Sequence, residues 1–105
     1  MYAVIFRAEP DLLDDDYYDT VKLLRDLAFN EYRCREFVAV TEGGTEIAVS
    51  YWDSEEDIRA WREASEHRVA QRQGLMKWYK SFRVDVVEVK RSYTRERRAL
   101  EARET

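Results

Sequence analysis

Two glycines, Gly43 and Gly44, separate two runs of residues that alternate in the manner of β-strands. Residues 33–41 and residues 45–52 are rich in β-branched and aromatic side chains, and their apolar positions recur with a period of two. A two-residue glycine turn between such runs indicates an antiparallel β-hairpin. The glycine pair is not a phosphate-binding loop, because neither the Walker spacing nor the dinucleotide-binding spacing surrounds it. The sheet of this protein is therefore expected to include this hairpin.

Extended and helical segments flank the hairpin on both sides. Residues 2–8 are predicted to form a strand. Residues 14–30 are predicted to form a helix, because they begin with three aspartates and carry apolar residues at helical spacing. After the hairpin, Ser54 is the expected N-cap of a second helix, a further helical stretch covers residues 66–79, and a last strand covers residues 82–89. The order β–α–β–β–α–β predicts an α+β, ferredoxin-like subunit, with a four-stranded antiparallel sheet and helices on one face.

The length and the C-terminal composition predict one domain followed by an arm. A chain of 105 residues fits a single domain, which we expect to span residues 1–91. Residues 92–105 are rich in Arg and Glu, and Leu100 is their only large aliphatic residue. Arg97 and Glu101 are spaced to pair on a helix, but no apolar stripe accompanies them. This segment is therefore expected to be a charged arm outside the compact domain.

The charge balance and the apolar pattern exclude several partners and locations. The net charge is −4 and the pI is about 5.1, whereas nucleic-acid binding needs a basic excess. No run approaches the roughly 18 apolar residues of a membrane span. The first residues lack the basic region and cleavage site of a signal peptide, so we expect a cytoplasmic protein. The single cysteine, Cys34, is interpreted as a small packed residue rather than a reactive thiol.

The chain has one histidine, His67, and it is the candidate catalytic base. Its unperturbed pKa lies closest to neutrality of all the side chains present. On a continuous helix His67 and Trp61, six positions apart, would point about 120° away from each other. The catalytic hypothesis therefore requires a break near Ser65, with Ser65 capping a new helix whose first turn carries His67. The alternative interpretation is an ordinary surface histidine.

Aromatic residues near the strand ends and on the helices suggest a pocket. Tyr51, Trp61 and Trp78 are its candidate walls, and Arg83 is a candidate hydrogen-bond donor to a ligand. Core packing is the competing explanation for each aromatic residue, and a surface ion pair is the competing explanation for Arg83. No metal site is expected, because one His and one Cys cannot supply a tetrahedral zinc set.

The sequence resembles a known family, the antibiotic biosynthesis monooxygenases. The resemblance covers about residues 2–90 and is carried by these residues: Tyr51, Trp52, Asp53, Ser54, Glu55, Glu56, Ile58, Trp61, Glu66, His67, Arg68, Ala70, Gln71, Gly74, Trp78 and Tyr79. It implies a ferredoxin-like subunit that pairs with a second copy as a dimeric α/β-barrel, with a pocket between sheet and helices. Some members oxidise polycyclic phenols and anthrones without a cofactor, and others bind and degrade haem.

Three functional hypotheses follow from the resemblance and the residues together. The first is a cofactor-independent monooxygenase acting on an aromatic, phenolic small molecule. The second is a non-catalytic small-molecule-binding or stress-associated dimer. The third is a haem-binding or haem-degrading protein, which is disfavoured because residues 2–8 lack the Asn that marks such members.

Both faces of the first strand, residues 2–8, are apolar. We therefore also expect a homodimer that buries the sheet face left open by the helices.

Overall fold

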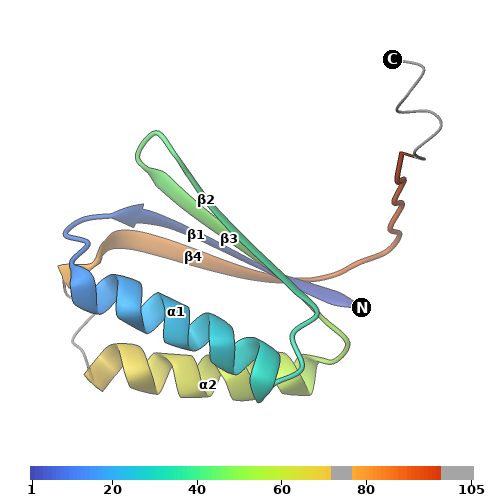
Figure 1. Cartoon of the computed structure of the whole chain (residues 1–105), viewed down its shortest axis with the longest axis horizontal. Helices are drawn as coiled ribbons and strands as arrows, with labels where there is room; N and C mark the ends of the chain where they lie inside the picture. The colour runs from blue at the N-terminus through green and yellow to red at the C-terminus, as the bar shows by residue number, and fades with distance from the viewer. Residues whose placement is uncertain (72–76, 98–105) are drawn as a thin grey trace.

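A computed structural model of the chain describes residues 1–71 and 77–97 (Figure 1). Its elements follow in this order: β1 (Tyr2–Pro10), α1 (Asp15–Asn30), β2 (Glu36–Glu42), β3 (Thr45–Trp52), α2 (Glu55–Gln71) and β4 (Tyr79–Glu88). The predicted β–α–β–β–α–β order is confirmed. Part of the helical stretch expected over residues 66–79, including Gly74, lies outside the described residues.

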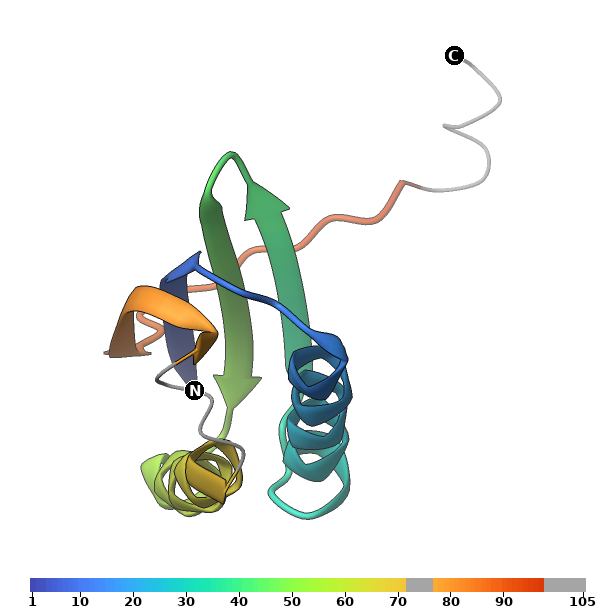
Figure 2. The ribbon, with the colours of Figure 1, turned by 90° about the vertical axis from the view of Figure 1, so that its left-hand side faces the viewer.

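The four strands form one antiparallel sheet in the order β2-β3-β1-β4. The two helices lie side by side on one face of this sheet and leave the other face uncovered, as Figure 1 and Figure 2 show. The hairpin pairs β2 with β3, and β1 lies between β3 and β4. The fold is thus the predicted ferredoxin-like α+β arrangement, with two layers and one open sheet face.

The hairpin turn has the backbone conformation that its glycines allow. Gly43 has a φ of +61°, a left-handed value that residues with a Cβ atom adopt rarely. A Cβ atom added at Gly43 would meet nothing within 4 Å, so glycine is required here by backbone conformation and not by lack of space. The turn fixes the register in which Thr45 opposes Glu42.

Both predicted helix starts are capped by side chains. Asp14 is the N-cap of α1, and its carboxylate Oδ1 accepts a 3.0 Å hydrogen bond from the backbone N–H of Tyr17. That hydrogen bond is the main reason why the pKa of Asp14 is lowered. Ser54 caps α2, because its Oγ accepts a 3.1 Å hydrogen bond from the backbone N–H of Asp57. Each cap satisfies a backbone donor that the helix itself leaves free.

The core lies between the helices and the helix-facing side of the sheet. Its buried residues are Val4, Ala28, Cys34, Trp52 and Ile58. Trp52 is the largest of them and is fully buried, and its indole N–H donates a 2.8 Å hydrogen bond to Ser50 Oγ. Burial also raises the pKa of the Cys34 thiol, which disfavours the reactive thiolate form.

The open face of the sheet carries a group of apolar side chains. Strand alternation places Ile5, Val49 and Val38 next to one another across β1, β3 and β2. Val38 and Val40 on the edge strand β2 are 58% and 57% exposed. Apolar side chains gathered on one exposed face usually mark a contact surface. We refer to this surface below as the open sheet face.

Beyond β4, residues 89–97 run away from the two layers (Figure 1). Residues 92–97 belong to no helix or strand and are exposed; the remainder of the predicted arm lies outside the described residues. No helix within residues 1–71 and 77–97 is long and apolar enough to cross a membrane.

Removing residues 92–105 is expected to change the melting temperature by less than about 4 °C, because exposed segments contribute little to stability. Thermal unfolding of the truncated and full-length chains, each at two protein concentrations, measures this. A larger drop that is the same at both concentrations would show that the arm belongs to the domain fold.

Candidate functional site

An apolar pocket of about 430 Å³ lies between the sheet and the helices. All four strands and both helices contribute to its lining. Phe6, Phe82 and Tyr79 form one aromatic wall, in which Phe6 lies 5.5 Å from Tyr79 and 6.0 Å from Phe82 between ring centroids. The small residues Ala39 and Ala48 leave space on the sheet side. This lining suits a flat apolar molecule.

Trp61 is the predicted site residue that lines this pocket. Its ring packs edge-on against Phe37, with centroids 6.0 Å apart, and lies 5.2 Å from the buried Trp52. The indole N–H donates a 2.9 Å hydrogen bond to the carbonyl oxygen of Leu24, which ties α2 to α1. Trp61 is therefore held rigidly, as a pocket wall requires. Its role in substrate binding stays a prediction.

Tyr51, Trp78 and Arg83, the other residues expected to contact a ligand, do not line this pocket. Tyr51 pairs with Ala3 and faces the open side, because its strand neighbours turn toward the helices. Arg83 lies on that same open side and forms a 2.9 Å ion pair with Asp85. Trp78 is 1% exposed, and its indole N–H donates a 3.0 Å hydrogen bond to Asp14 Oδ1. Trp78 is thus a structural residue that supports the start of α1.

The break that the His67 hypothesis requires is absent, since α2 is continuous from Glu55 to Gln71. Ser65 does not cap a new helix; its Oγ donates a 2.7 Å hydrogen bond back to the carbonyl oxygen of Trp61, one turn earlier. His67 is exposed, and its Nε2 lies 3.2 Å from the Gln71 side-chain nitrogen. It does not line the pocket. The surface interpretation of this histidine therefore replaces the catalytic one.

A polar group that the sequence analysis did not single out stands in the pocket wall. Glu46 lines the pocket at the beginning of β3, and its Oε1 accepts a short hydrogen bond from the hydroxyl group of Tyr17. Oε2 of Glu46 is shielded from solvent and has no hydrogen-bond partner in the described part of the chain. In the sequence, Glu46 is an ordinary charged residue beside a hairpin turn. Its place in the pocket wall is recognised only from its hydrogen bond with Tyr17.

Two tyrosines, Tyr17 and Tyr79, lie near this carboxyl group. Burial, together with the hydrogen bond to Glu46, raises the pKa of Tyr17 far above its usual range. Burial also raises the pKa of Tyr79 to about 12. Both phenols therefore stay protonated at neutral pH, and Tyr17 donates its hydrogen bond to Glu46. The rings of Tyr17 and Tyr79 pack edge-on with centroids 5.9 Å apart.

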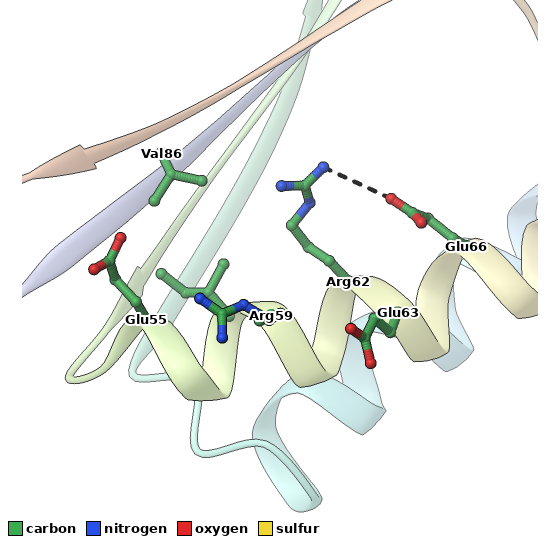
Figure 3. A pocket seen from close by; sticks show the side chains of 7 residues that line it. Glu55, Arg59, Arg62, Glu63, Glu66 and Val86 are labelled. Carbon is green, nitrogen blue, oxygen red and sulfur yellow. Dashed lines mark ion pairs between the residues drawn. The ribbon is translucent and has the colours of Figure 1, made fainter.

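A second hollow, of about 310 Å³, lies between α2 and β4. Figure 3 shows its charged lining, in which Arg59 and Arg62 stand among three carboxylates, those of Glu55, Glu63 and Glu66. Arg62 and Glu66 lie 3.6 Å apart and line the apolar pocket as well, so this ion pair borders both hollows. Because opposite charges nearly balance, this hollow has no strong preference for anions or cations.

The fold of this chain is shared with a class of solved structures. SnoaB, a cofactor-independent oxygenase from Streptomyces nogalater solved as a point mutant, has a TM-score of 0.69 at 5% identity, over 87% of this chain and 94% of that chain. A candidate antibiotic biosynthesis monooxygenase from Nitrosomonas europaea has a TM-score of 0.65 at 13% identity, over 87% and 100%. Rv0793 from Mycobacterium tuberculosis has a TM-score of 0.59 at 20% identity, over 89% and 98%. The chain has the fold of the antibiotic biosynthesis monooxygenase proteins, which confirms the resemblance at the level of fold.

A relative of higher identity shows the family. The uncharacterized protein YqjZ of Bacillus subtilis (strain 168) is 37% identical over 91 residues, which are 86% of this chain and 80% of YqjZ. The chain belongs to the same family as YqjZ. No protein-family profile matches the chain.

Proposed function

We propose that this protein is a cofactor-independent monooxygenase that oxidises an aromatic, phenolic small molecule in the pocket between sheet and helices. The observation that carries the proposal is the apolar pocket itself, with its aromatic wall and a buried carboxyl group among apolar side chains. Deprotonation of such a phenolic molecule gives an electron-rich anion that can reduce oxygen directly, and a positioned side chain can accept the proton. SnoaB, which shares the fold, is named a cofactor-independent oxygenase, and this likeness supports the choice of reaction.

With anthrone as substrate, the protein is expected to speed oxygen uptake by about 10²-fold or more over buffer, the lower end of what one positioned acid–base group contributes. An oxygen electrode measures the rate, and the absorbance of the quinone product accounts for the oxygen consumed. Uptake at the buffer rate would contradict the proposal.

A matched pair of variants links this activity to the pocket. Ala48 lines the pocket, whereas Ala60 is exposed on α2 and lines neither hollow. Ala48→Phe fills the pocket and is expected to abolish the accelerated uptake, while Ala60→Phe keeps it. Equal activity in the two variants would show that the reaction does not take place in the pocket.

The two alternatives predict different results in the same assays. A non-catalytic binding protein would bind the aromatic molecule in the pocket without oxygen uptake. Haem binding usually needs an axial side-chain ligand, and His67 lies outside the pocket lining. A Soret band that appears on adding haem and survives His67→Ala would favour the haem alternative.

We also propose that two copies pair through the open sheet face. The exposure of Val38 and Val40 supports this, because a water-facing sheet surface normally carries polar residues at such positions. A second copy would cover these side chains and close the two sheets against each other. Sedimentation velocity at micromolar concentration should therefore give the mass of a dimer.

A further inference from the structure

The carboxyl group of Glu46 has one oxygen that the described part of the chain leaves without a donor. Oε1 accepts the hydrogen bond from the Tyr17 hydroxyl, and Oε2 is shielded from solvent. An ionised carboxylate offers about four lone-pair sites, and a buried oxygen without a donor is costly to keep. A residue in such a state within a pocket wall is a candidate recognition group.

Glu46 lines the pocket, but its shielded Oε2 is not open to it, so a ligand can reach this oxygen only when the carboxyl group turns. Its neighbours across the sheet are Ala8 on β1, which is 2% exposed, and Thr41 on β2. Tyr17, on the helix side, is 3% exposed and already donates to Oε1. The torsion about the last bond of a glutamate side chain is soft, so the carboxyl group can rotate and turn Oε2 toward the pocket.

We propose that Glu46 is the hydrogen-bond acceptor that selects the ligand of this pocket, and that the ligand is a neutral aromatic molecule carrying a hydroxyl or N–H donor. This inference rests on the proposed function, because it takes the pocket as the ligand site. The aromatic wall of Phe6 and Phe82 accepts a flat ring system. Charge on the ring system that lies against these apolar walls is excluded, because its hydration would be lost there. Tyr17 is a positioning residue, since its hydroxyl orients the carboxylate.

Isothermal titration calorimetry with 2-naphthol and 2-methoxynaphthalene tests the proposal, because these two probes differ by a methyl group that removes the donor. The wild-type protein is expected to bind 2-naphthol about 10-fold or more tightly, the scale of a hydrogen bond to a charged acceptor. Without such a bond the methyl ether, which is the more apolar of the two probes, should bind at least as well.

Two variants place the preference on Glu46. Glu46→Gln keeps the size of the side chain but removes its charge, and it is expected to reduce the ratio of the two dissociation constants below about threefold. Glu56→Gln makes the same change in an exposed residue of the first turn of α2 that lines neither hollow, and it should keep the wild-type ratio. Circular dichroism shows whether each variant is folded.

The possible results are distinguishable. Equal affinity of wild-type protein for both probes would overturn the role of Glu46 and leave the proposed function standing. An unchanged ratio in folded Glu46→Gln would do the same. If neither probe binds the wild-type protein, the pocket is not an aromatic site, and the proposed function falls together with this inference. Should Glu46→Gln not fold, equal affinity of the wild-type protein for the two probes still overturns the inference.

Discussion

Replacing Trp52 with alanine is expected to lower the free energy of unfolding by about 3–5 kcal/mol, the usual cost of removing a fully buried large aromatic side chain. Trp52 is 0% exposed and packs with Val4 and Ile58, which join the sheet to α2. The substitution would leave a cavity and would also remove the hydrogen bond to Ser50 Oγ, which is itself buried. A domain of this size has only about 5–15 kcal/mol of stability, so the variant should be close to unfolding.

Urea unfolding followed by circular dichroism measures this change. Tyr93→Ala is the matched control, because Tyr93 is an aromatic residue that is 85% exposed. The control is expected to stay within about 0.5 kcal/mol of the wild-type protein. A loss below about 1 kcal/mol for Trp52→Ala would show that Trp52 is not packed as described.

Replacing Val49 with aspartate should weaken self-association by about 10²-fold or more, because a dimer would bury an unpaired carboxylate. Val49 lies in the middle of the open sheet face, paired with Ile5 on one side and Val38 on the other. Its side chain points away from the helices, so the monomer core should be little affected. The variant is therefore expected to be a folded monomer.

Sedimentation velocity over a concentration series tests this result. Ala60→Asp introduces the same charge on the exposed side of α2, away from the sheet, and should sediment as the wild-type protein does. Dimers of Val49→Asp with wild-type affinity would place the interface elsewhere. A wild-type chain that is monomeric at micromolar concentration would refute the dimer itself.

The fold could be predicted because its main signals are local. Gly43 and Gly44 separate two strands of alternating pattern, and the turn requires the left-handed conformation that glycine supplies. Asp14 and Ser54 cap the helices through hydrogen bonds to residues three positions later. Each signal depends on residues close in sequence, and together they define the order of elements from which the sheet follows.

The break near Ser65 that the His67 hypothesis required does not form, for a physical reason. Serine favours helix caps because its hydroxyl competes for backbone groups, but the same hydroxyl can bond to the carbonyl oxygen four residues earlier and remain inside a helix. Ser65 does the latter, with Trp61 as its partner. The local sequence does not distinguish the two outcomes. The expected position of His67 in the pocket depended on a helix cap at Ser65, and without that cap His67 does not reach the pocket.

The pocket could be predicted as a feature but not in its composition. An aromatic residue in the sequence carries no mark that separates a pocket wall from a core residue, as Trp61 and Trp78 show. The strand period does place Tyr51 and Arg83 on one face, but which face the helices cover depends on packing. Glu46 becomes notable only through Tyr17, which is 29 residues away in sequence. Such long-range pairs lie beyond pattern analysis.

Neither of the two fully buried tryptophans lines the apolar pocket. The pocket walls instead include Phe82, which is 50% exposed, and the small residues Ala39 and Ala48. Exchanges at these positions remove little buried surface and should cost little free energy of unfolding. Because such substitutions are tolerated, the ligand preference of the pocket can change during evolution before a stabilising substitution elsewhere is needed. The separation of Trp52 and Trp78 from the pocket thus makes this scaffold evolvable, so descendants of one ancestral chain can diverge in ligand while keeping the same architecture.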